Sequence, residues 1–308
     1  MGAGSGAARL PCAGIAAGCN FPAHAPSSTS SSPFPARPIM AVNLSRRLHA
    51  SLALLVVTTT LLPRGIAAQE IIRDSLPGQR LQWELVRVPG GAVTVPGADG
   101  PVRVQVASFL IGRTEVPWEL YDIFYLRLDV PREDRARVDA ASRPSRPYGA
   151  PDRGFGHRGY AAISLTHGAA VRFAAWLSTR TGHTYAVATD AQWQRAADLA
   201  FDGIATEAMD DQVWSALNAD GTPHPVATRA PDRLGLYDLL GNVGEWVTGE
   251  DGTPWLRGGS YLTRRADLAP TVRERQVPAW NQTDPQDPKS RWWLSDGPFA
   301  GLRLVRIN

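Results

Sequence analysis

The distribution of cysteine constrains this chain more than any other feature of its sequence. Cys12 and Cys19 are its only two cysteines, and both lie near the N-terminus. Residues 69–308 therefore contain no disulfide, no thiolate metal ligand and no thiol nucleophile. A segment of this length can bury enough apolar surface to fold without covalent staples. We therefore expect a domain held by its core and by polar contacts alone.

The first 39 residues are rich in Gly, Ala, Ser and Pro and show almost no apolar periodicity. Such a low-complexity composition cannot bury enough surface to offset the entropy lost on ordering. We predict that residues 1–39 are either disordered or an extension upstream of the true start at Met40.

A secretory signal peptide is predicted over residues 40–68. Arg46 and Arg47 precede an apolar run over 48–62, and small residues follow up to Ala68, near which we expect cleavage. The expected location is therefore the periplasm or the medium. The apolar run is short for a bilayer span, so a membrane anchor is the weaker alternative, and no membrane span is expected after cleavage.

The charge balance argues against a nucleic-acid partner. The whole chain has 32 basic and 29 acidic residues, but five of the arginines and none of the acids lie in residues 1–68. The remaining chain is therefore slightly acidic, with mixed signs. Nucleic-acid binding needs a basic stripe, which this pattern does not supply.

Apolar periodicity predicts few regular elements. Period-two patterns predict strands at 83–88, at 102–109 with one face buried, and at 301–307. Helical spacing predicts three helices: 115–128 with Pro117 in its first turn, 167–181 between Thr166 and Gly182 with Val171 on the apolar face, and a third that starts at the Thr189–Gln192 capping box. The Arg-, Pro- and Gly-rich composition of residues 132–158, without periodicity, predicts a solvated surface loop, and loops are expected to dominate after Phe201. Together these patterns favour one α+β domain.

Several colinear blocks resemble the formylglycine-generating enzyme family, the sulfatase-modifying-factor domain. They are Gly235–Trp246 (GLYDLLGNVGEW), Leu256–Tyr261 (LRGGSY) and Gly301–Arg306 (GLRLVR), with Phe109–Val116 and Thr189–Trp193 in matching order upstream. The resemblance implies a domain over residues 69–308. It also implies an α+β fold that is a C-type-lectin-like variant, low in regular secondary structure, in a single domain.

The resemblance also implies a calcium ion. Asn242 and Glu245, with a main-chain carbonyl near Val243, match positions that hold calcium in family members, and hard oxygen ligands of this kind suit calcium. The alternative left open is that Asn242 and Glu245 cap loop amides and pair with an arginine. For the family's second calcium site, Asn218 matches one ligand position, and the downstream acidic ligand has no clear counterpart.

The family's two copper-binding cysteines are replaced here. The matching positions are Thr263 and Leu268, and neither side chain binds Cu(I) at neutral pH. Formylglycine generation by the copper and cysteine route is therefore excluded, and we expect no copper and no catalytic residue. The pocket beside Ser260 and Tyr261 distinguishes an enzyme from a non-enzyme. If side chains fill this pocket, a substrate cysteine has no room, whereas an open polar cleft favours an enzyme.

Other metal and acid–base sites have weaker support. Sulfoxide synthases of the same clan hold iron through histidines from an additional helical domain, which has no counterpart here, so iron is not expected. His167 and His183 flank one predicted helix, about 20 Å apart, and cannot share an ion. A set of His157, His167 and an acid remains open, as does a role for these histidines as loop donors. No spacing brings together the candidate acids, which are Asp122, Asp190 and Glu245.

Two functions remain. The first is a secreted, calcium-associated pseudoenzyme that serves as a binding or structural module of the cell envelope. Its partner would be a protein or a glycan, met by residues 132–158 and 276–296. The aromatic faces of Trp280, Trp292 and Trp293 suit such a partner, unless these side chains belong to the core. The second is a metal-dependent oxidoreductase of the non-haem iron type that acts on a sulfur-containing or protein substrate.

Overall fold

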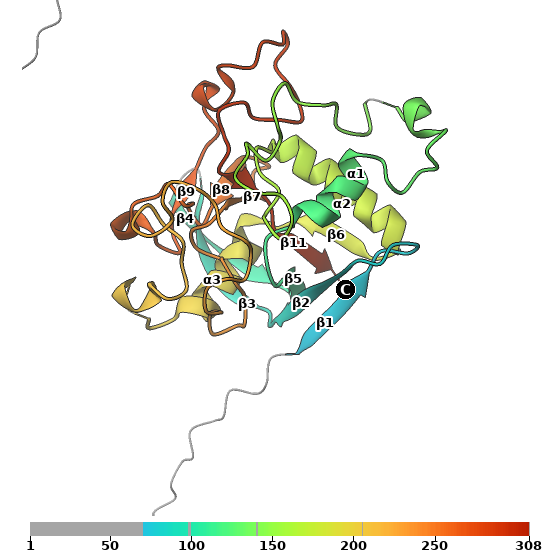
Figure 1. Ribbon diagram of the computed structural model, residues 1–308. Coiled ribbons are helices and arrows are strands. Elements are labelled where there is room, and N and C mark those ends of the chain that lie inside the picture. Colours follow the sequence, from blue (N-terminus) through green and yellow to red (C-terminus); the bar gives the residue numbers. More distant parts are fainter. Residues whose placement is uncertain (1–69, 98–99, 140, 205, 308) are drawn as a thin grey trace, which may run out of the picture. The chain divides into compact units, whose positions relative to one another are not determined.

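The structure is a computed structural model that describes residues 70–97, 100–139, 141–204 and 206–307 (Figure 1). The predicted low-complexity segment and signal peptide lie outside the described residues, so those predictions stay predictions. Among the described residues, no helix is both long enough and apolar enough to cross a bilayer.

An antiparallel five-stranded sheet joins the two ends of the described chain. Its strand order is β1 (Ile71–Ser75), β2 (Gln82–Val88), β5 (Phe109–Gly112), β11 (Leu304–Ile307) and β6 (Thr184–Val187). The last strand lies between β5 and β6, with Val305 opposite Ile111 and Ala186. The predicted strand at 83–88 is confirmed, whereas the predicted final strand divides into β11 and the short β10 (Ala300–Gly301).

A second sheet carries the blocks that resembled the known family. Its order is β10, β7 (Gly244–Thr248), β8 (Pro254–Arg257) and β9 (Arg273–Glu274). Four short 3₁₀ turns interrupt the loops, at Arg135–Arg137, Thr206–Met209, Arg265–Asp267 and Pro278–Asn281.

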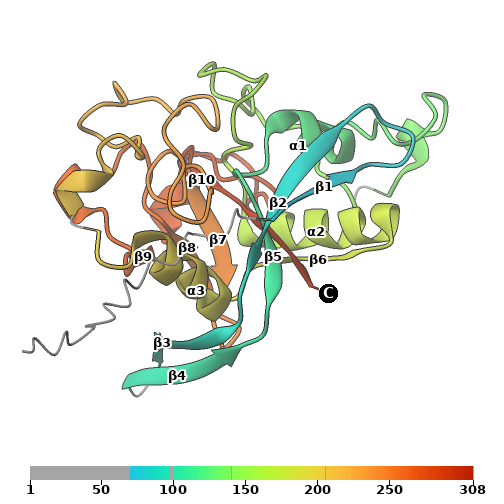
Figure 2. The ribbon, with the colours of Figure 1, turned by 90° about the horizontal axis from the view of Figure 1, so that it is seen from below.

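A hairpin formed by β3 (Gly91–Gly97) and β4 (Gly100–Val106) projects from the sheets as an arm (Figure 2). The prediction of one half-buried strand over 102–109 was wrong in two ways. The segment contributes to β4 and β5 separately, and Val102 in β4 is 47% exposed. Alternation alone does not show which strand of a hairpin meets the body, and here β3 packs closely against the third helix.

The helices are α1 (Trp118–Tyr125), α2 (His167–Thr181) and α3 (Asp190–Phe201). The bounds of α2 and both of its caps are confirmed: the Thr166 hydroxyl accepts the Ala169 N–H, and Gly182 has φ 75°. Val171, however, is exposed. Helix α1 is shorter than predicted because Pro117 is its extended N-cap residue, which leaves Glu115 before the helix.

The large sheet has a core on each face. Consecutive strand residues point to opposite sides, so Leu110 packs with α1 and α2, whereas Ile111 packs with α3. The second core also contains Trp193, and the first contains Trp246. This two-sided packing supports the loops that carry the candidate sites.

Candidate functional site

The two positions that match the family's cysteines have structural roles here. Leu268 is buried in the core beside α3. The Thr263 hydroxyl accepts the Ser260 N–H at 2.9 Å, and its own N–H donates to the Ser260 carbonyl, so Thr263 closes a turn. Gly259 lies between them with φ 67°, and a Cβ there would come within 2.5 Å of the Leu268 side chain. Glycine is therefore required at this close approach.

The region beside Ser260 contains a buried tyrosine and, next to it, an open hollow. Tyr261 is buried against Phe155, and burial raises the pKa of its hydroxyl to about 12. Outside it, a hollow of about 450 Å³ is lined by Ser260, Leu262, Thr263, Arg264, Asp267, Val272, Glu274 and Phe299. This lining mixes polar side chains with Leu262, Val272 and Phe299, and it contains no imidazole and no thiol. It therefore offers none of the ligands that Cu(I) prefers.

Asn242 and Glu245 bind protein donors in this structure. Glu245 is fully buried, and its Oε1 accepts from Arg303 Nε at 2.8 Å while its Oε2 accepts from Trp193 Nε1 at 2.8 Å. Asn242 Oδ1 accepts the His224 N–H at 2.9 Å. This geometry follows the alternative that the sequence left open, a loop cap and an arginine pair. As these oxygens lie, they do not fit a calcium ion without displacing protein donors.

Two further buried carboxylates lie in the same cluster, and the sequence reasoning did not place them there. Glu115 Oε1 accepts from Asn242 Nδ2 at 3.0 Å, and Asp238 Oδ2 accepts the Ala227 N–H at 2.8 Å. Their other oxygens, Glu115 Oε2 and Asp238 Oδ1, are buried without a partner. Burial, together with the neighbouring carboxylates, raises the pKa of Glu115 well above its ordinary range and that of Asp238 to about 6.

Glu115 Oε2 and Asp238 Oδ1 are the two oxygens of this cluster that could bind a cation without losing a protein partner. They are hard oxygen atoms of the kind calcium prefers, but two are too few for its usual coordination. Within the described part of the chain, no group of three or more His, Cys, Asp or Glu side chains could hold a metal ion. Calcium at Asn242, Val243 and Glu245 therefore stays a prediction, and Glu115 and Asp238 are the residues through which to test it.

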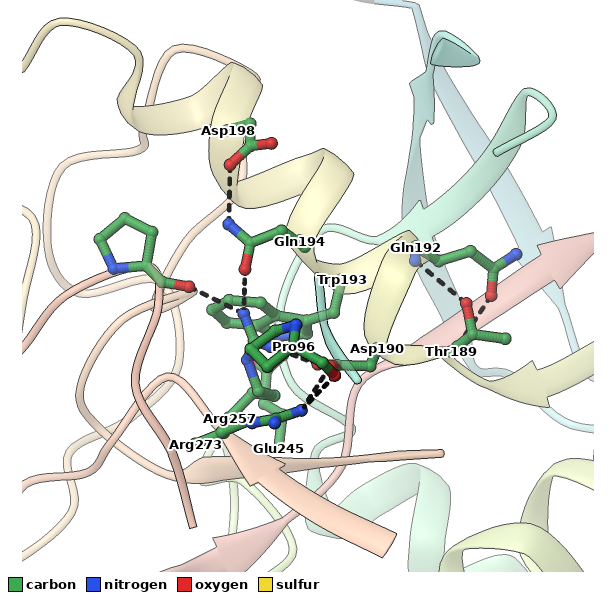
Figure 3. Close-up of polar contacts among 11 residues, drawn as sticks. Pro96, Thr189, Asp190, Gln192, Trp193, Gln194, Asp198, Glu245, Arg257 and Arg273 are labelled. Carbon is green, nitrogen blue, oxygen red and sulfur yellow. Dashed lines mark hydrogen bonds and ion pairs between the residues drawn. The ribbon is translucent and has the colours of Figure 1, made fainter. Parts of the chain in front are cut away.

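The start of α3 supplies Asp190 to a buried ion pair and Trp193 to a hydrogen bond with Glu245 (Figure 3). The predicted capping box is confirmed, since the Thr189 and Gln192 side chains bond each other's backbone N–H groups. Asp190 binds the fully buried Arg257 and also Arg273. Trp193 donates to Glu245, and the Arg257 guanidinium lies over its ring, 4.4 Å from the centroid. The residues that resembled the family motif are thus the polar framework of the fold.

His157 lies between two carboxylates that are far from each other in sequence. Its Nε2 is 2.8 Å from Asp122 Oδ2 in α1, and its Nδ1 is 2.9 Å from Asp152 Oδ2. The ring also stacks on Trp118, with centroids 4.8 Å apart. His167 is elsewhere and contacts the Thr248 hydroxyl. The candidate metal set of His157 with His167 is therefore not assembled, and Asp122 instead belongs to an Asp–His–Asp clasp made of Asp122, His157 and Asp152.

Titration of this clasp predicts a pH dependence of stability. Burial lowers the pKa of His157, but the bonds to Asp122 and Asp152 outweigh it and raise the pKa above 6.5. Stability that comes from protonated His157 is then fully present below the unfolded-state pKa of about 6.5, and it is lost as the pH rises through the folded-state pKa.

We expect the His157→Gln variant to be less stable than the wild type below about pH 6.5, and the difference to shrink as the pH rises through the raised pKa of His157. Urea unfolding across this range measures it. The exposed His183→Gln variant is the control and should follow the wild type. A difference between wild type and His157→Gln that stays constant with pH would contradict the assignment of the charge to His157.

The two segments predicted to meet a partner lie against each other. Trp293 Nε1 donates to the Ser145 carbonyl at 2.7 Å, and Arg291 Nη2 donates to the Ala141 carbonyl at 2.6 Å. Arg153 Nη2 donates to the Leu294 carbonyl at 3.0 Å and to the Ser295 carbonyl at 2.8 Å. We call this paired region, residues 141–153 with 283–295, the joined surface.

The tryptophans follow the alternative that the sequence left open, and the predicted surface loop is exposed or half-buried over most of its length. Trp280, Trp292 and Trp293 are all buried and belong to the core on the α1–α2 face, so their rings do not form an exposed aromatic patch. The loop over 132–158 is not wholly solvated either. Arg143 is buried in an ion pair with Asp129 at 2.8 Å and also donates to the Phe124 carbonyl. Composition alone gives neither result, because both depend on which segments pack together.

The fold and these sites define a mixed α/β domain with short elements and long loops, held by buried arginine–carboxylate pairs. A family model described as "Sulfatase-modifying factor enzyme 1-like domain" matches residues 75–291, well over half of the chain. The chain therefore belongs to this family, which confirms the resemblance found in the sequence blocks. The C-type-lectin-like variant expected for it is consistent with the fold described above.

Solved structures with the same fold support this assignment. The chain is 17% identical to variable protein 1 of Treponema denticola, with 78% of this chain and 99% of that chain covered and a TM-score of 0.54. It is 18% identical to PvdO from Pseudomonas aeruginosa, with 78% and 98% covered and a TM-score of 0.54. At these identities the likeness concerns the fold alone. A comparison with curated proteins gives no match.

Proposed function

We propose that this protein is a secreted binding module of the cell envelope, built on a sulfatase-modifying-factor fold that does not generate formylglycine by the copper and cysteine route. The observation that carries the proposal is the joined surface. Hydrogen bonds between residues 141–153 and 283–295 hold two long loops as one preformed face. A face that is ordered before binding loses less entropy when a partner docks.

The replaced cysteine positions also support a binding role. Leu268 is part of the core and Thr263 closes a turn, so neither side chain is free to act on a substrate thiol. We expect no aldehyde when the protein is incubated with a cysteine-containing sulfatase-type peptide, copper and oxygen. A mass spectrum that shows conversion of the peptide cysteine to formylglycine would contradict this prediction.

Retention of envelope glycans and proteins tests the binding role. The probes are a glycan array and an envelope fraction, each presented to the full chain. We expect the double variant Tyr148→Ala with Gln286→Ala, two residues of the joined surface, to lose the retained material. Leu217→Ala, at an exposed site on another loop, is the matched control and should retain it. Equal retention by both variants would place binding elsewhere.

A second candidate is a metal-dependent oxidoreductase of the non-haem iron type. The hollow beside Ser260 and Thr263 favours it, because the hollow is open and a substrate could reach that region from solvent. Metal analysis of the protein purified without chelator, followed by oxygen uptake with thiol substrates, separates the two candidates. Stoichiometric iron with thiol-dependent oxygen uptake would replace the binding role as the first choice.

A further inference from the structure

A small hollow opens within the joined surface. Its volume is about 130 Å³, and its lining includes Tyr148, Arg153, Asp284, Gln286 and Ser290. Both segments of the joined surface contribute walls, so the hollow exists only because they pack together. The volume corresponds to about four water-sized groups. It therefore suits one functional group of a ligand rather than a whole sugar or peptide.

The charged acceptor at this hollow, Asp284, already binds protein donors. Asp284 is buried, and its Oδ1 accepts the Gln286 N–H at 3.0 Å while its Oδ2 accepts the Ser290 N–H at 2.6 Å and bonds Asn281 Nδ2 at 3.4 Å. The Leu294 and Ser295 carbonyls accept from Arg153. Both carboxylate oxygens of Asp284 are therefore already engaged by protein donors.

The unused groups are mostly donors. The Arg153 guanidinium donates from Nε to the Ser164 hydroxyl and from Nη2 to two carbonyls, and among the described residues Nη1 has no hydrogen-bond partner. Ser290 Oγ accepts the N–H groups of Trp292 and Trp293, so its own hydrogen remains to be donated. Within the described part of the chain, the Tyr148 hydroxyl and the side-chain amide of Gln286 have no hydrogen-bond partner either.

Two further observations point to a ligand. Arg153, which lines the hollow, has φ 56°, a left-handed backbone conformation that is uncommon outside glycine. Tyr148 stands on the rim with 75% of its surface exposed, which is unusual for a large aromatic residue and leaves its ring free to cover a carbon skeleton. A guanidinium with adjacent neutral donors is an arrangement that recognises carboxylate.

We propose that the hollow binds a carboxylate group, with Arg153 as the charged donor, Ser290 and Gln286 as neutral donors, and Tyr148 as the platform for the attached ligand. The proposal rests on the binding role proposed above and names its ligand chemistry. The carboxylate could belong to an acidic sugar or to the C-terminus of a peptide, two sources with the same chemistry at this site.

Titration calorimetry on the full chain tests the proposal with two pairs of probes. Galacturonic acid against galactose tests the sugar source, and an acetylated dipeptide with a free C-terminus against its amide tests the peptide source. We expect the acid of one pair to bind at least about tenfold more tightly than its neutral counterpart, as charged hydrogen bonds require. The pair that shows the difference identifies the source.

Variants separate recognition from folding. Arg153 also holds two carbonyls, so its alanine variant would perturb the joined surface. Tyr148→Ala and Gln286→Ala remove side chains that make no hydrogen bond to the described residues. Each variant should lower the affinity for the acid about three- to tenfold. Arg158→Ala, an exposed arginine of the same loop outside the lining, should change nothing.

The inference is overturned if neither acid binds up to about 10 mM, if acid and neutral probes bind equally, or if both alanine variants bind like the wild type. These failures can be told from failure of the binding role. If the double variant of the joined surface loses the retained envelope material but neither acid binds the wild type, the carboxylate site is overturned and the binding role is kept. Absence of both would contradict both.

Discussion

Replacement of Asp190 by alanine is expected to lower the free energy of unfolding by about 3–5 kcal/mol. Arg257 is fully buried and bonds Asp190, the Gln194 side chain and the Pro270 carbonyl. Without Asp190, its charge would remain in the core with only neutral acceptors, and an uncompensated buried charge is what makes such substitutions severe. Arg273 would lose the same partner.

Urea unfolding of the full chain measures this loss. The matched control is the exposed pair Arg264–Asp267, where Asp267→Ala should cost no more than about 1 kcal/mol because solvent screens the charges. If Asp190→Ala cost no more than this control, the buried network of Figure 3 would contribute nothing measurable to stability. The double variant Asp190→Ala with Arg257→Met should regain part of the loss, since it removes the stranded charge.

The second large effect concerns Glu245. Glu245→Gln is expected to destabilise by about 3–5 kcal/mol, because Arg303 is buried and would lose its charged partner. Glu115→Gln, in the same cluster, should cost about 1 kcal/mol or less. Burial raises the pKa of Glu115, so we expect its carboxyl to be neutral, the form that glutamine resembles.

Thermal and urea unfolding of the two glutamine variants make this comparison in one background. Equal losses would show that Glu115 is ionised as Glu245 is, and would contradict the assignment of the neutral carboxyl. The same variants test calcium. An ion held through the free oxygens of Glu115 and Asp238 would make the wild type lose melting temperature on chelation with EDTA, and Glu115→Gln would lack that response.

Elements with local signals were predictable from sequence. Thr166, Gly182 and the Thr189–Gln192 box define the ends of α2 and the start of α3 through hydrogen bonds that span only a few residues. The family was predictable for a similar reason. Its blocks are short runs of residue identities in a fixed order, and they contain a glycine at a close approach, Gly259, and a residue of the ion-pair network, Asp190.

Burial was less predictable where it depends on partners distant in sequence. Val102 and Val171 fit apolar patterns but are 47% and 43% exposed, because an apolar pattern does not show which face another segment covers. Trp292 and Trp293 lie in a polar, loop-rich segment and yet are core residues. No periodicity within the segment distinguishes a tryptophan that packs on α1 from one that faces solvent.

The sequence by itself determined the family, the lack of cysteine ligands at positions 263 and 268, and the helix caps, because each depends on residue identity or on contacts within a few positions. Only the tertiary structure decided which charges meet. Asp122 and Asp152 converge on His157, Glu115 and Asp238 join Glu245, and residues 141–153 join 283–295. Side chains far apart in the chain become neighbours through packing of the whole fold, and the cost of burying their charges is set there.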